Sequence, residues 1–273
     1  MVRMTSLTVA LAQIEATADP AANAALVEDA VRRAAVENAQ LAVFPEATMC
    51  RFGVPLGPVA EPLDGPWATR IAAAAAATGV HLVAGMFTPA ADGRVRNTLL
   101  SIAPDGARAH YDKIHLFDAF GFAESRTVKP GDRAVLVDVA GVTVGLSTCY
   151  DLRFPALYQG LADAGAQAIL APASWGDGPG KLDAFTTLSR ARALDSTTFV
   201  VAVDQARPAV AEGRAPRGVG GSLAVGPDGA VLAQAGAGPE LLVVDLPLER
   251  LDEVRATLPV LANRRDFTVA TEG

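Results

Sequence analysis

The chain is poor in cysteine and has no long apolar run. Its two cysteines among 273 residues, Cys50 and Cys149, are too few for a disulfide framework, and their separation matches no metal-binding spacing. No stretch reaches the roughly 18 consecutive apolar residues of a transmembrane helix. The first residues lead directly into an amphipathic strand, without the apolar core of a signal peptide. We therefore expect a cytoplasmic protein that does not bind membranes.

A basic stripe is also missing. The 23 lysine and arginine residues against 30 aspartate and glutamate residues give a formal net charge of −7, spread along the chain. This balance disfavours nucleic acid or an anionic membrane as a partner. Hydrophobic residues make up 51% of the chain and charged residues 19%, which is typical of a well-packed α/β protein rather than a disordered one.

Strands and helices alternate in two parts of the chain, and hairpins lie between and after them. The predicted alternating elements are strand 7–14, helix 20–38, strand 40–44, helix 66–77 and strand 81–87, then helix 154–164, strand 168–171, helix 182–195 and strand 199–203. This alternation predicts a mainly parallel, buried sheet.

Three hairpins are predicted around short turns. Two of them centre on Pro104-Asp105-Gly106 and Pro227-Asp228-Gly229, and the third on Ala140-Gly141. The two halves therefore carry the same kinds of element and the same Pro-Asp-Gly turn. This indicates internal pseudo-symmetry, although no residue-level repeat accompanies it.

Cys149 is a candidate nucleophile. The apolar segment 142–148 predicts a strand that runs into Cys149, and the residues after it read as the start of a helix. At such a turn, backbone N–H groups and the helix N-terminus converge on the side chain, which lowers a thiol pKa and offers an oxyanion site. That arrangement suits acyl transfer. The alternative is a buried, passive thiol, which is common for free cysteine.

Three further residues could complete a site. Glu46 ends an apolar strand, where partial burial would raise its pKa and let it act as a base; the alternative is an exposed loop glutamate. Lys113 also ends a strand and could stabilise a thiolate and an oxyanion, or be half of a buried ion pair with Asp112. Glu124 lies in a long loop between two hairpins, and such loops are often functional.

Three ordered motifs resemble those of the nitrilase superfamily of carbon–nitrogen hydrolases. They are Phe44-Pro45-Glu46, the segment 111–117 around Lys113, and Cys149-Tyr150-Asp151-Leu152-Arg153-Phe154-Pro155. The likeness continues through Glu124-Ser125, Pro130-Gly131-Asp132, Ala171-Pro172-Ala173-Ser174-Trp175, the Arg-Ala-Arg-Ala-Leu-Asp segment 190–195, and Leu258-Pro259-Val260 with Arg264-Arg265. It therefore covers nearly the whole chain.

This resemblance implies a fold and a set of roles. The expected fold is an αββα sandwich over a single domain, 1–273, that pairs as a homodimer or higher homo-oligomer, with a C-terminal tail from about 247 to 273 contributing to the dimer. The implied general base is Glu46 and the nucleophile is Cys149. Lys113 would stabilise the oxyanion, and Glu124 would position the lysine or the substrate. No metal or organic cofactor is implied.

The residues after Cys149 resemble the Nit-type branch, which includes ω-amidases and deaminated-glutathione amidases. This favours a small carboxylated amide as substrate, hydrolysed through a thioester on Cys149 with release of ammonia. The residues expected to bind the substrate are Tyr150, through its backbone N–H, and Arg153, Ser174 and Trp175. Arg153 could instead form a structural ion pair with Asp151 or with an acidic helix residue.

One segment departs from the family pattern and keeps alternatives open. Where relatives commonly carry His-Trp ahead of the Arg-Ala-Arg-Ala helix, this chain reads Lys181-Leu182-Asp183-Ala184-Phe185. Two hydrogen-bonding groups are therefore lost near the expected pocket, so the substrate can differ in size or polarity. The alternatives are an N-carbamoyl amino acid hydrolase or a nitrilase, and a non-catalytic binding subunit that keeps the fold.

Overall fold

Two six-stranded sheets form the centre of the molecule. The computed structural model describes residues 5–209 and 217–271. The strands of the first half are β1 (Ser6–Gln13), β2 (Leu41–Val43), β3 (His81–Pro89), β4 (Val95–Ile102) and β5 (Arg108–Asp112). Those of the second half are β8 (Val135–Val139), β9 (Val142–Leu146), β10 (Ala168–Ala173), β11 (Phe199–Asp204), β12 (Leu223–Val225), β13 (Val231–Gln234) and β14 (Glu240–Pro247). The first sheet has the order β14-β1-β2-β3-β4-β5 and the second β13-β12-β11-β10-β9-β8.

Both sheets are mixed, so the prediction of a mainly parallel sheet was wrong. Only the central strands, β1-β2-β3 and β9-β10-β11, run parallel. All other neighbours in the two sheets are antiparallel. The physical reason is that a short turn can join only antiparallel neighbours. Each predicted hairpin therefore adds antiparallel strands around a parallel centre.

The two sheets share one topology. Read from β14 in the first sheet and from β8 in the second, each sheet shows one antiparallel pair, two parallel pairs and two antiparallel pairs. The pseudo-symmetry indicated by the sequence is thus present in the fold. The edge strand β14 is the exception in chain order, because it comes from the end of the chain and returns to pair with β1.

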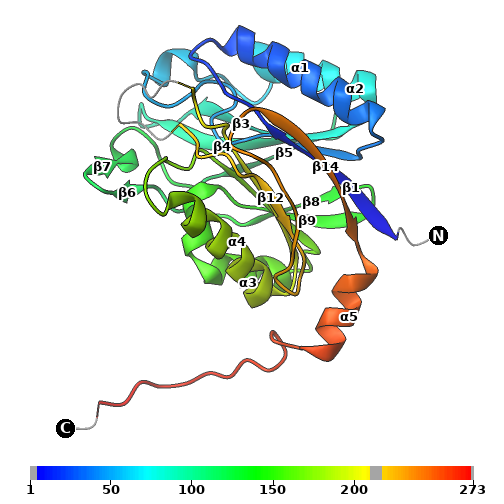
Figure 1. The fold of residues 1–273 in the computed structure, drawn as a ribbon. Helices are drawn as coiled ribbons and strands as arrows, with labels where there is room; N and C mark the ends of the chain where they lie inside the picture. Colours follow the sequence, from blue (N-terminus) through cyan, green and yellow to red (C-terminus); the bar gives the residue numbers. More distant parts are fainter. Residues whose placement is uncertain (1–4, 210–216, 272–273) are drawn as a thin grey trace.

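Helices cover both outer faces of the sheet pair. The helices α1 (Pro20–Val36) and α2 (Pro66–Thr78) lie over the first sheet, and α3 (Pro155–Asp163) and α4 (Lys181–Ser196) lie over the second (Figure 1). Buried apolar clusters fill the space between the sheets and beneath each helix pair. This arrangement confirms the predicted αββα sandwich. Within 5–209 and 217–271, no helix has the length and hydropathy needed to cross a bilayer.

Local sequence signals set the ends of the first two helices. The Asp19 carboxylate accepts a hydrogen bond from the Ala21 N–H at 2.9 Å, and Pro20 occupies the first helical position. Gly79 ends α2 with a left-handed φ of 71°, a conformation that glycine adopts without a steric penalty. The boundaries predicted for these two helices differ from the observed ones by two residues or fewer.

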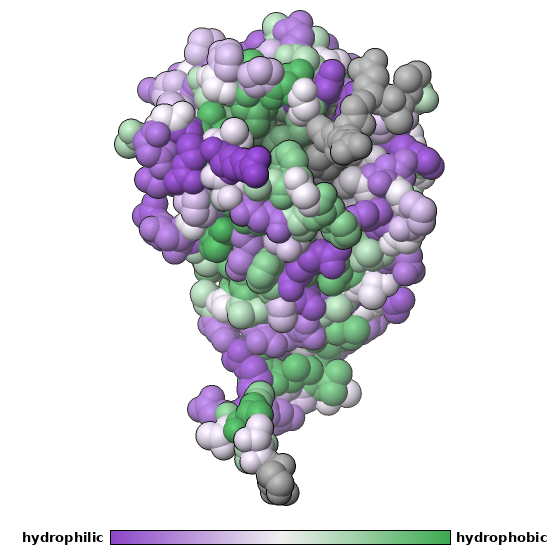
Figure 2. Space-filling view, turned by 90° about the vertical axis from the view of Figure 1, so that its left-hand side faces the viewer, coloured by the Kyte–Doolittle hydropathy of each residue, from purple (hydrophilic) through white to green (hydrophobic). Residues whose placement is uncertain are grey.

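The chain leaves the sandwich at its C-terminus. After α5 (Glu249–Thr257), the residues from 258 to 271 run away from the body (Figures 1 and 2). Phe267 and Val269 in this segment are 86% and 85% exposed. The described part of the chain therefore presents apolar side chains on an extended tail with no sandwich residue covering them.

We expect Gly85→Ala to destabilise the fold. A Cβ on Gly85 in β3 would lie 2.6 Å from Ala47 N and 2.9 Å from Glu46 Cα, so the turn that carries Glu46 would have to move. Such overpacking typically costs about 1–3 kcal/mol of unfolding free energy, measurable by urea denaturation. Gly160→Ala is the control, because a Cβ at this position in α3 meets nothing within 4 Å. This substitution should raise the free energy of unfolding by about 0.5–1 kcal/mol. Unchanged stability of Gly85→Ala would contradict this reading.

Candidate active site

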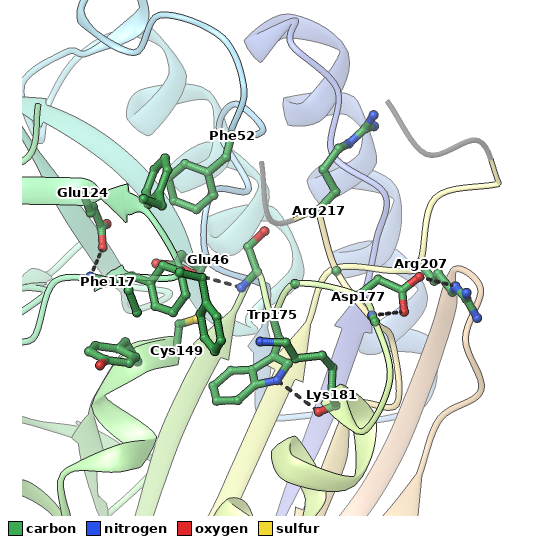
Figure 3. Close-up of a pocket in the computed structure, with 18 of the residues that line it drawn as sticks. Glu46, Phe52, Phe117, Glu124, Cys149, Trp175, Asp177, Lys181, Arg207 and Arg217 are labelled. Atoms are coloured by element: carbon green, nitrogen blue, oxygen red, sulfur yellow. Dashed lines mark hydrogen bonds and ion pairs between the residues drawn. The ribbon is translucent and has the colours of Figure 1, made fainter. Parts of the chain in front are cut away.

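The predicted site residues meet in one cavity. A cavity of about 780 Å³ is lined by Glu46, Lys113, Glu124 and Cys149, and also by Tyr150, Arg153, Ser174 and Trp175. Figure 3 labels Glu46, Glu124, Cys149 and Trp175 around this cavity. These residues come from both sheets and from the long connection between them. The fold therefore brings together all eight side chains that the sequence motifs single out.

Lys113 lies at the centre of a buried ion-pair network. Its Nζ donates to Glu46 Oε1 at 2.8 Å and to Glu124 Oε2 at 2.9 Å, and its side chain is 2% exposed. Burial opposes the charged form, but the carboxylates of Glu124 and Glu46 outweigh it, so the pKa of Lys113 rises well above its usual value. Asp112 pairs instead with Arg96, at 3.1 Å. Lys113 is thus a cation at neutral pH, aimed into the cavity rather than at its sequence neighbour.

Glu46 follows β2 and is 1% exposed, so it is not an exposed loop glutamate. Its Oε1 accepts from Lys113 and from Asn97 Nδ2 at 2.7 Å, while its Oε2 accepts from the Ser174 backbone N–H at 3.0 Å. Each oxygen therefore has a fixed set of donors. The carboxylate is held in a single orientation inside the cavity.

Asn97 is a site residue that sequence reasoning did not single out. Its amide also donates to Glu124 Oε1 at 3.1 Å, so it joins the two glutamates. Asn97 lies in β4, which pairs with β5, the strand that precedes Lys113. The Lys113 backbone N–H donates to Asn97 O at 2.9 Å. The sequence offered one signal for Asn97: it is a polar residue at the N-terminal end of the strand that precedes the predicted turn at Pro104-Asp105-Gly106.

Glu124 begins a short 3-10 turn (Glu124–Arg126) after the hairpin of β6 (Asp118–Ala119) and β7 (Phe122–Ala123). It is 3% exposed, and the backbone N–H of Phe117 donates to its Oε2 at 2.7 Å. Burial raises the pKa of Glu124, but the charge of Lys113 and the hydrogen bond from the Phe117 N–H together lower it by more. The net shift of the pKa is therefore downward. The long loop therefore supplies an ionised partner for Lys113.

Cys149 occupies a strained turn that follows β9 (Val142–Leu146) after Ser147 and Thr148. It has a φ of +47° and begins a 3-10 segment (Cys149–Arg153), not an α-helix. The α-helix begins only at Pro155, which suits a first helical position because proline has no N–H to donate. Non-glycine residues at positive φ are uncommon and cluster at functional sites. The sequence predicted a strand-to-helix turn here, and the structure shows that the residues from Cys149 onward form a 3-10 turn, with the α-helix beginning one residue later than predicted.

The pKa of Cys149 is raised, not lowered as the sequence suggested. Burial is the main cause and the neighbouring Glu46 adds to it, while Lys113 and the Ser174 backbone N–H act in the opposite direction. Cys149 is 8% exposed, so desolvation dominates over the turn's favourable dipoles. The resting sulfur is therefore a thiol, and attack requires a base beside it.

Asp151 accepts hydrogen bonds that hold the turn at Cys149 in place. Its carboxylate accepts from Thr148 N at 2.8 Å, from Tyr111 Oη at 2.7 Å and from His115 N at 3.1 Å, and it lies 2.7 Å from His115 Nδ1. Asp151 therefore does not form the ion pair with Arg153 that the sequence left open. The Arg153 guanidinium lies instead over the Trp175 ring, 5.2 Å from its centroid. Sequence reasoning considered Asp151 only as a partner for Arg153. Its contacts with Tyr111 and His115 connect the turn after β9 of the second sheet to the segment 111–115, which contains Lys113.

Of the segment 181–185, which departs from the family pattern, Lys181 lines the cavity and Phe185 does not. Phe185 is fully buried and packs on Trp175 with ring centroids 5.4 Å apart, and it does not line the cavity. Lys181 does line it, with its Nζ 4.3 Å from the ring centroid of Phe120, and its carbonyl accepts from Trp175 Nε1 at 3.1 Å (Figure 3). In the described ranges, no three His, Cys, Asp or Glu side chains gather as metal ligands.

Comparison with known proteins places this geometry in context. The model of the carbon-nitrogen hydrolase family matches residues 8–256. A protein of Mycobacterium tuberculosis named only as a hydrolase is 54% identical over 95% of this chain and 96% of its own. The deaminated glutathione amidase of Escherichia coli O157:H7 is 35% identical over 94% and 97%. The human omega-amidase NIT2 is 32% identical over 98% and 99%.

Solved structures show the same architecture. Nit3 of Saccharomyces cerevisiae, a member of branch 10 of the nitrilase superfamily, matches with a TM-score of 0.85 at 26% identity, over 97% of this chain and 99% of that one. An amidase of Nesterenkonia sp. AN1, in which acrylamide has added to the active-site cysteine, matches with a TM-score of 0.77 at 28% identity, over 93% and 98%.

We expect Glu124→Gln to weaken the fold most at neutral pH. Since the pKa of Glu124 is lowered in the folded state, its ionised form stabilises the protein above the pKa of an unfolded glutamate, about 4.3, and that contribution is lost as the pH falls through the folded-state pKa. Removing one of two partners of a buried cation should cost up to about 3 kcal/mol at pH 7. Thermal melts from about pH 3 to 8 should show the gap to wild type narrowing in acid.

The exposed Glu37, at the end of α1, provides the control for this measurement. Glu37→Gln should melt with the wild type at every pH. A Glu124→Gln deficit that stays constant down to pH 3 would show that its ionisation contributes nothing to stability.

Proposed function

The chain belongs to the carbon–nitrogen hydrolase family, and from that premise we propose that it is a cysteine amidase that converts a small carboxylated amide to a carboxylate and ammonia. It is a Nit-type member of the nitrilase superfamily and an enzyme acting on carbon–nitrogen bonds other than peptide bonds. The observation that carries the proposal is the Lys113 ammonium held between Glu46 and Glu124 in the cavity that Cys149 lines.

In the proposed acylation step, Glu46 accepts the thiol proton of Cys149 as the sulfur attacks the amide carbonyl carbon. The raised pKa of the thiol makes this transfer necessary. The carbonyl oxygen becomes an oxyanion, which the Lys113 ammonium and the backbone N–H of Tyr150 stabilise. When the tetrahedral intermediate collapses, protonated Glu46 gives its proton to the leaving nitrogen. Ammonia departs, and the acyl group stays on sulfur as a thioester.

In the proposed deacylation step, Glu46 removes a proton from water, which attacks the thioester carbonyl carbon. The same oxyanion donors act again, and the Cys149 sulfur leaves and regains a proton from Glu46. Lys113 stays charged through both steps, because its pKa lies well above its usual value. Its two carboxylate partners hold it in place, and Glu124 thus acts by positioning the lysine.

Two features support a carboxylated substrate. Arg153 lines the cavity with its guanidinium over Trp175 at 5.2 Å, and its neighbour in the motif, Asp151, is engaged elsewhere. An arginine stacked on an aromatic ring presents a planar pair of donors suited to a carboxylate. The named relatives are an omega-amidase and a deaminated glutathione amidase. Tyr150, Ser174 and Trp175 complete the proposed substrate wall.

The test is ammonia release from α-ketoglutaramate, deaminated glutathione and a panel of short-chain amides. We expect turnover of at least one carboxylated amide, and Cys149→Ala should lower kcat by at least about 10³-fold, as loss of a covalent nucleophile does elsewhere. No ammonia from any amide would overturn the proposal. Faster turnover of nitriles, or carbon dioxide release from N-carbamoyl amino acids, would redirect it to those reactions.

Arg153→Met supplies the matched control for substrate class. A charge-assisted hydrogen bond contributes about 1.5–3 kcal/mol, so KM for a carboxylated amide should rise roughly 10- to 100-fold. KM for a neutral amide of the same length should stay within about threefold of wild type. Equal effects on both amides would show that Arg153 does not bind the carboxylate.

We also propose that the enzyme is a homodimer to which the tail contributes. The support is the exposed Phe267 and Val269 on a segment that leaves the sandwich. Light scattering should give twice the chain mass of 28.0 kDa, and truncation after residue 257 should shift it towards the single-chain value. A full-length chain that is monomeric at micromolar concentration would contradict this.

A further inference from the structure

Two adjacent buried side chains have no part in the proposed chemistry. Asp204 ends β11 and is 0% exposed; Gln205 follows it and is 3% exposed. Neither lines the cavity. A buried carboxylate is costly unless donors satisfy it, so its contacts indicate what it holds in place.

Asp204 connects Trp175, which lines the cavity, to the segment 219–220. Its Oδ1 accepts from the Trp175 backbone N–H at 2.7 Å, and its Oδ2 accepts from Val219 N at 2.7 Å and Gly220 N at 3.1 Å. The residue before Trp175 contacts the proposed base directly: the Ser174 backbone N–H donates to Glu46 Oε2 at 3.0 Å. Asp204 thus fixes the segment that in turn fixes the Glu46 carboxylate.

Gln205 holds the same glutamate by its main chain. Its Nε2 donates to the carbonyl oxygen of Glu46 at 2.9 Å, and its Oε1 accepts from Ala16 N at 2.9 Å. Glu46 follows β2 of the first sheet, whereas Gln205 follows β11 of the second. One side chain therefore spans the interface between the sheets and reaches the main chain of the proposed base.

The surroundings leave this pair little freedom to move. Gly218 has a φ of +111°, and a Cβ there would lie 2.2 Å from Gln205 O. The Gln205 carbonyl also accepts from Gly220 N at 3.1 Å. The segment 218–220 is consequently packed directly against the Asp204-Gln205 backbone, with glycine at the position where a side chain would collide.

We propose that Asp204 and Gln205 are a pair of positioning residues that set the Glu46 carboxylate against the Cys149 sulfur, Gln205 through the Glu46 main chain and Asp204 through the Ser174-Trp175 peptide. This inference rests on the proposed role of Glu46 as the base. It explains why the second sheet places two polar side chains at the buried end of an apolar strand. A proton transfer is sensitive to the donor–acceptor distance, so small displacements of Glu46 should lower the rate markedly.

The electrostatics agree with this geometry. Burial raises the pKa of the Asp204 carboxyl to about 8, and the backbone N–H groups of Trp175 and Val219 oppose that rise. Burying a carboxyl is costly unless its oxygens accept hydrogen bonds, and here three backbone N–H groups donate to it. Fixing a catalytic base is a task that an apolar residue in the same place could not perform.

The experiment compares Asp204→Asn, Gln205→Met and Gln205→Glu with the wild type. Asp204→Asn places an amide N–H₂ among backbone donors, Gln205→Met removes both polar groups, and Gln205→Glu keeps the shape but loses the donor to Glu46 O. Ser101→Ala is the control, because Ser101 is equally buried and its Oγ contacts His81 Nε2 at 2.7 Å, away from the cavity. All variants are made in the wild type and in a Glu46→Gln background.

Two readouts are used. With an amide that the wild type hydrolyses, we expect each pair variant to lower kcat at least about 10-fold with KM within about threefold. Alkylation of Cys149 by iodoacetamide at pH 7 needs no amide, and we expect it to slow at least threefold in the wild-type background and not at all in the Glu46→Gln background. Ser101→Ala should lower the melting temperature without changing either rate.

The outcomes separate the alternatives. Equal slowing with and without Glu46, an alkylation rate that does not depend on Glu46, or unchanged rates in folded Gln205 variants would each overturn the inference. If no amide is hydrolysed but the Glu46-dependent alkylation pattern appears, the positioning role stands and the proposed amidase activity fails. Because the Gln205 variants act independently of Asp204, misfolding of Asp204→Asn leaves the test intact.

Discussion

One buried ammonium organises this site. Lys113 is 2% exposed and is held by two carboxylates from different parts of the chain. An isolated charge at such depth would cost several kcal/mol even after relaxation. The two carboxyl groups also outnumber the single cation, so their remaining lone pairs require neutral donors, which Asn97 and the backbone N–H groups of Ser174 and Phe117 supply. Residues from both sheets must therefore be in place before the network closes.

The proposed nucleophile and the proposed base are held in place by different groups of residues. Cys149 lies on a strained turn with a φ of +47°, and Asp151 holds that turn by bonds to Thr148, Tyr111 and His115. Glu46 is held by its own donors and, as we propose, by the Asp204-Gln205 pair. The turn at Cys149 belongs to the second sheet and Glu46 to the first. The proposed chemistry thus takes place across the interface of the two pseudo-symmetric halves, and packing between the sheets sets its geometry.

Much of the fold followed from local patterns, because hydrophobic periodicity, Asp19 capping and the Pro-Asp-Gly turns act within a few residues. The sheet type did not, since it depends on how hairpins join the parallel centre. Motifs identified eight of the residues that line the cavity, but they did not indicate the hydrogen-bonding roles of Asn97, Asp151 and Asp204. Their roles arise from contacts between residues far apart in sequence, such as Tyr111 with Asp151, which only the packed sheets create. The prediction of a lowered thiol pKa was wrong because it rested on the turn alone, whereas the extent of burial depends on how the sheets pack.

In the proposed reaction, Cys149 carries the acyl group during hydrolysis. Rapid-quench mass spectrometry of the intact enzyme with a hydrolysed amide tests it most directly, followed by peptide mapping and treatment with hydroxylamine. We expect a mass increase equal to the acyl group on the peptide that contains Cys149, which hydroxylamine removes and which Cys149→Ala lacks. An acyl adduct on any other residue during turnover, or hydrolysis by Cys149→Ala at the wild-type rate, would contradict it.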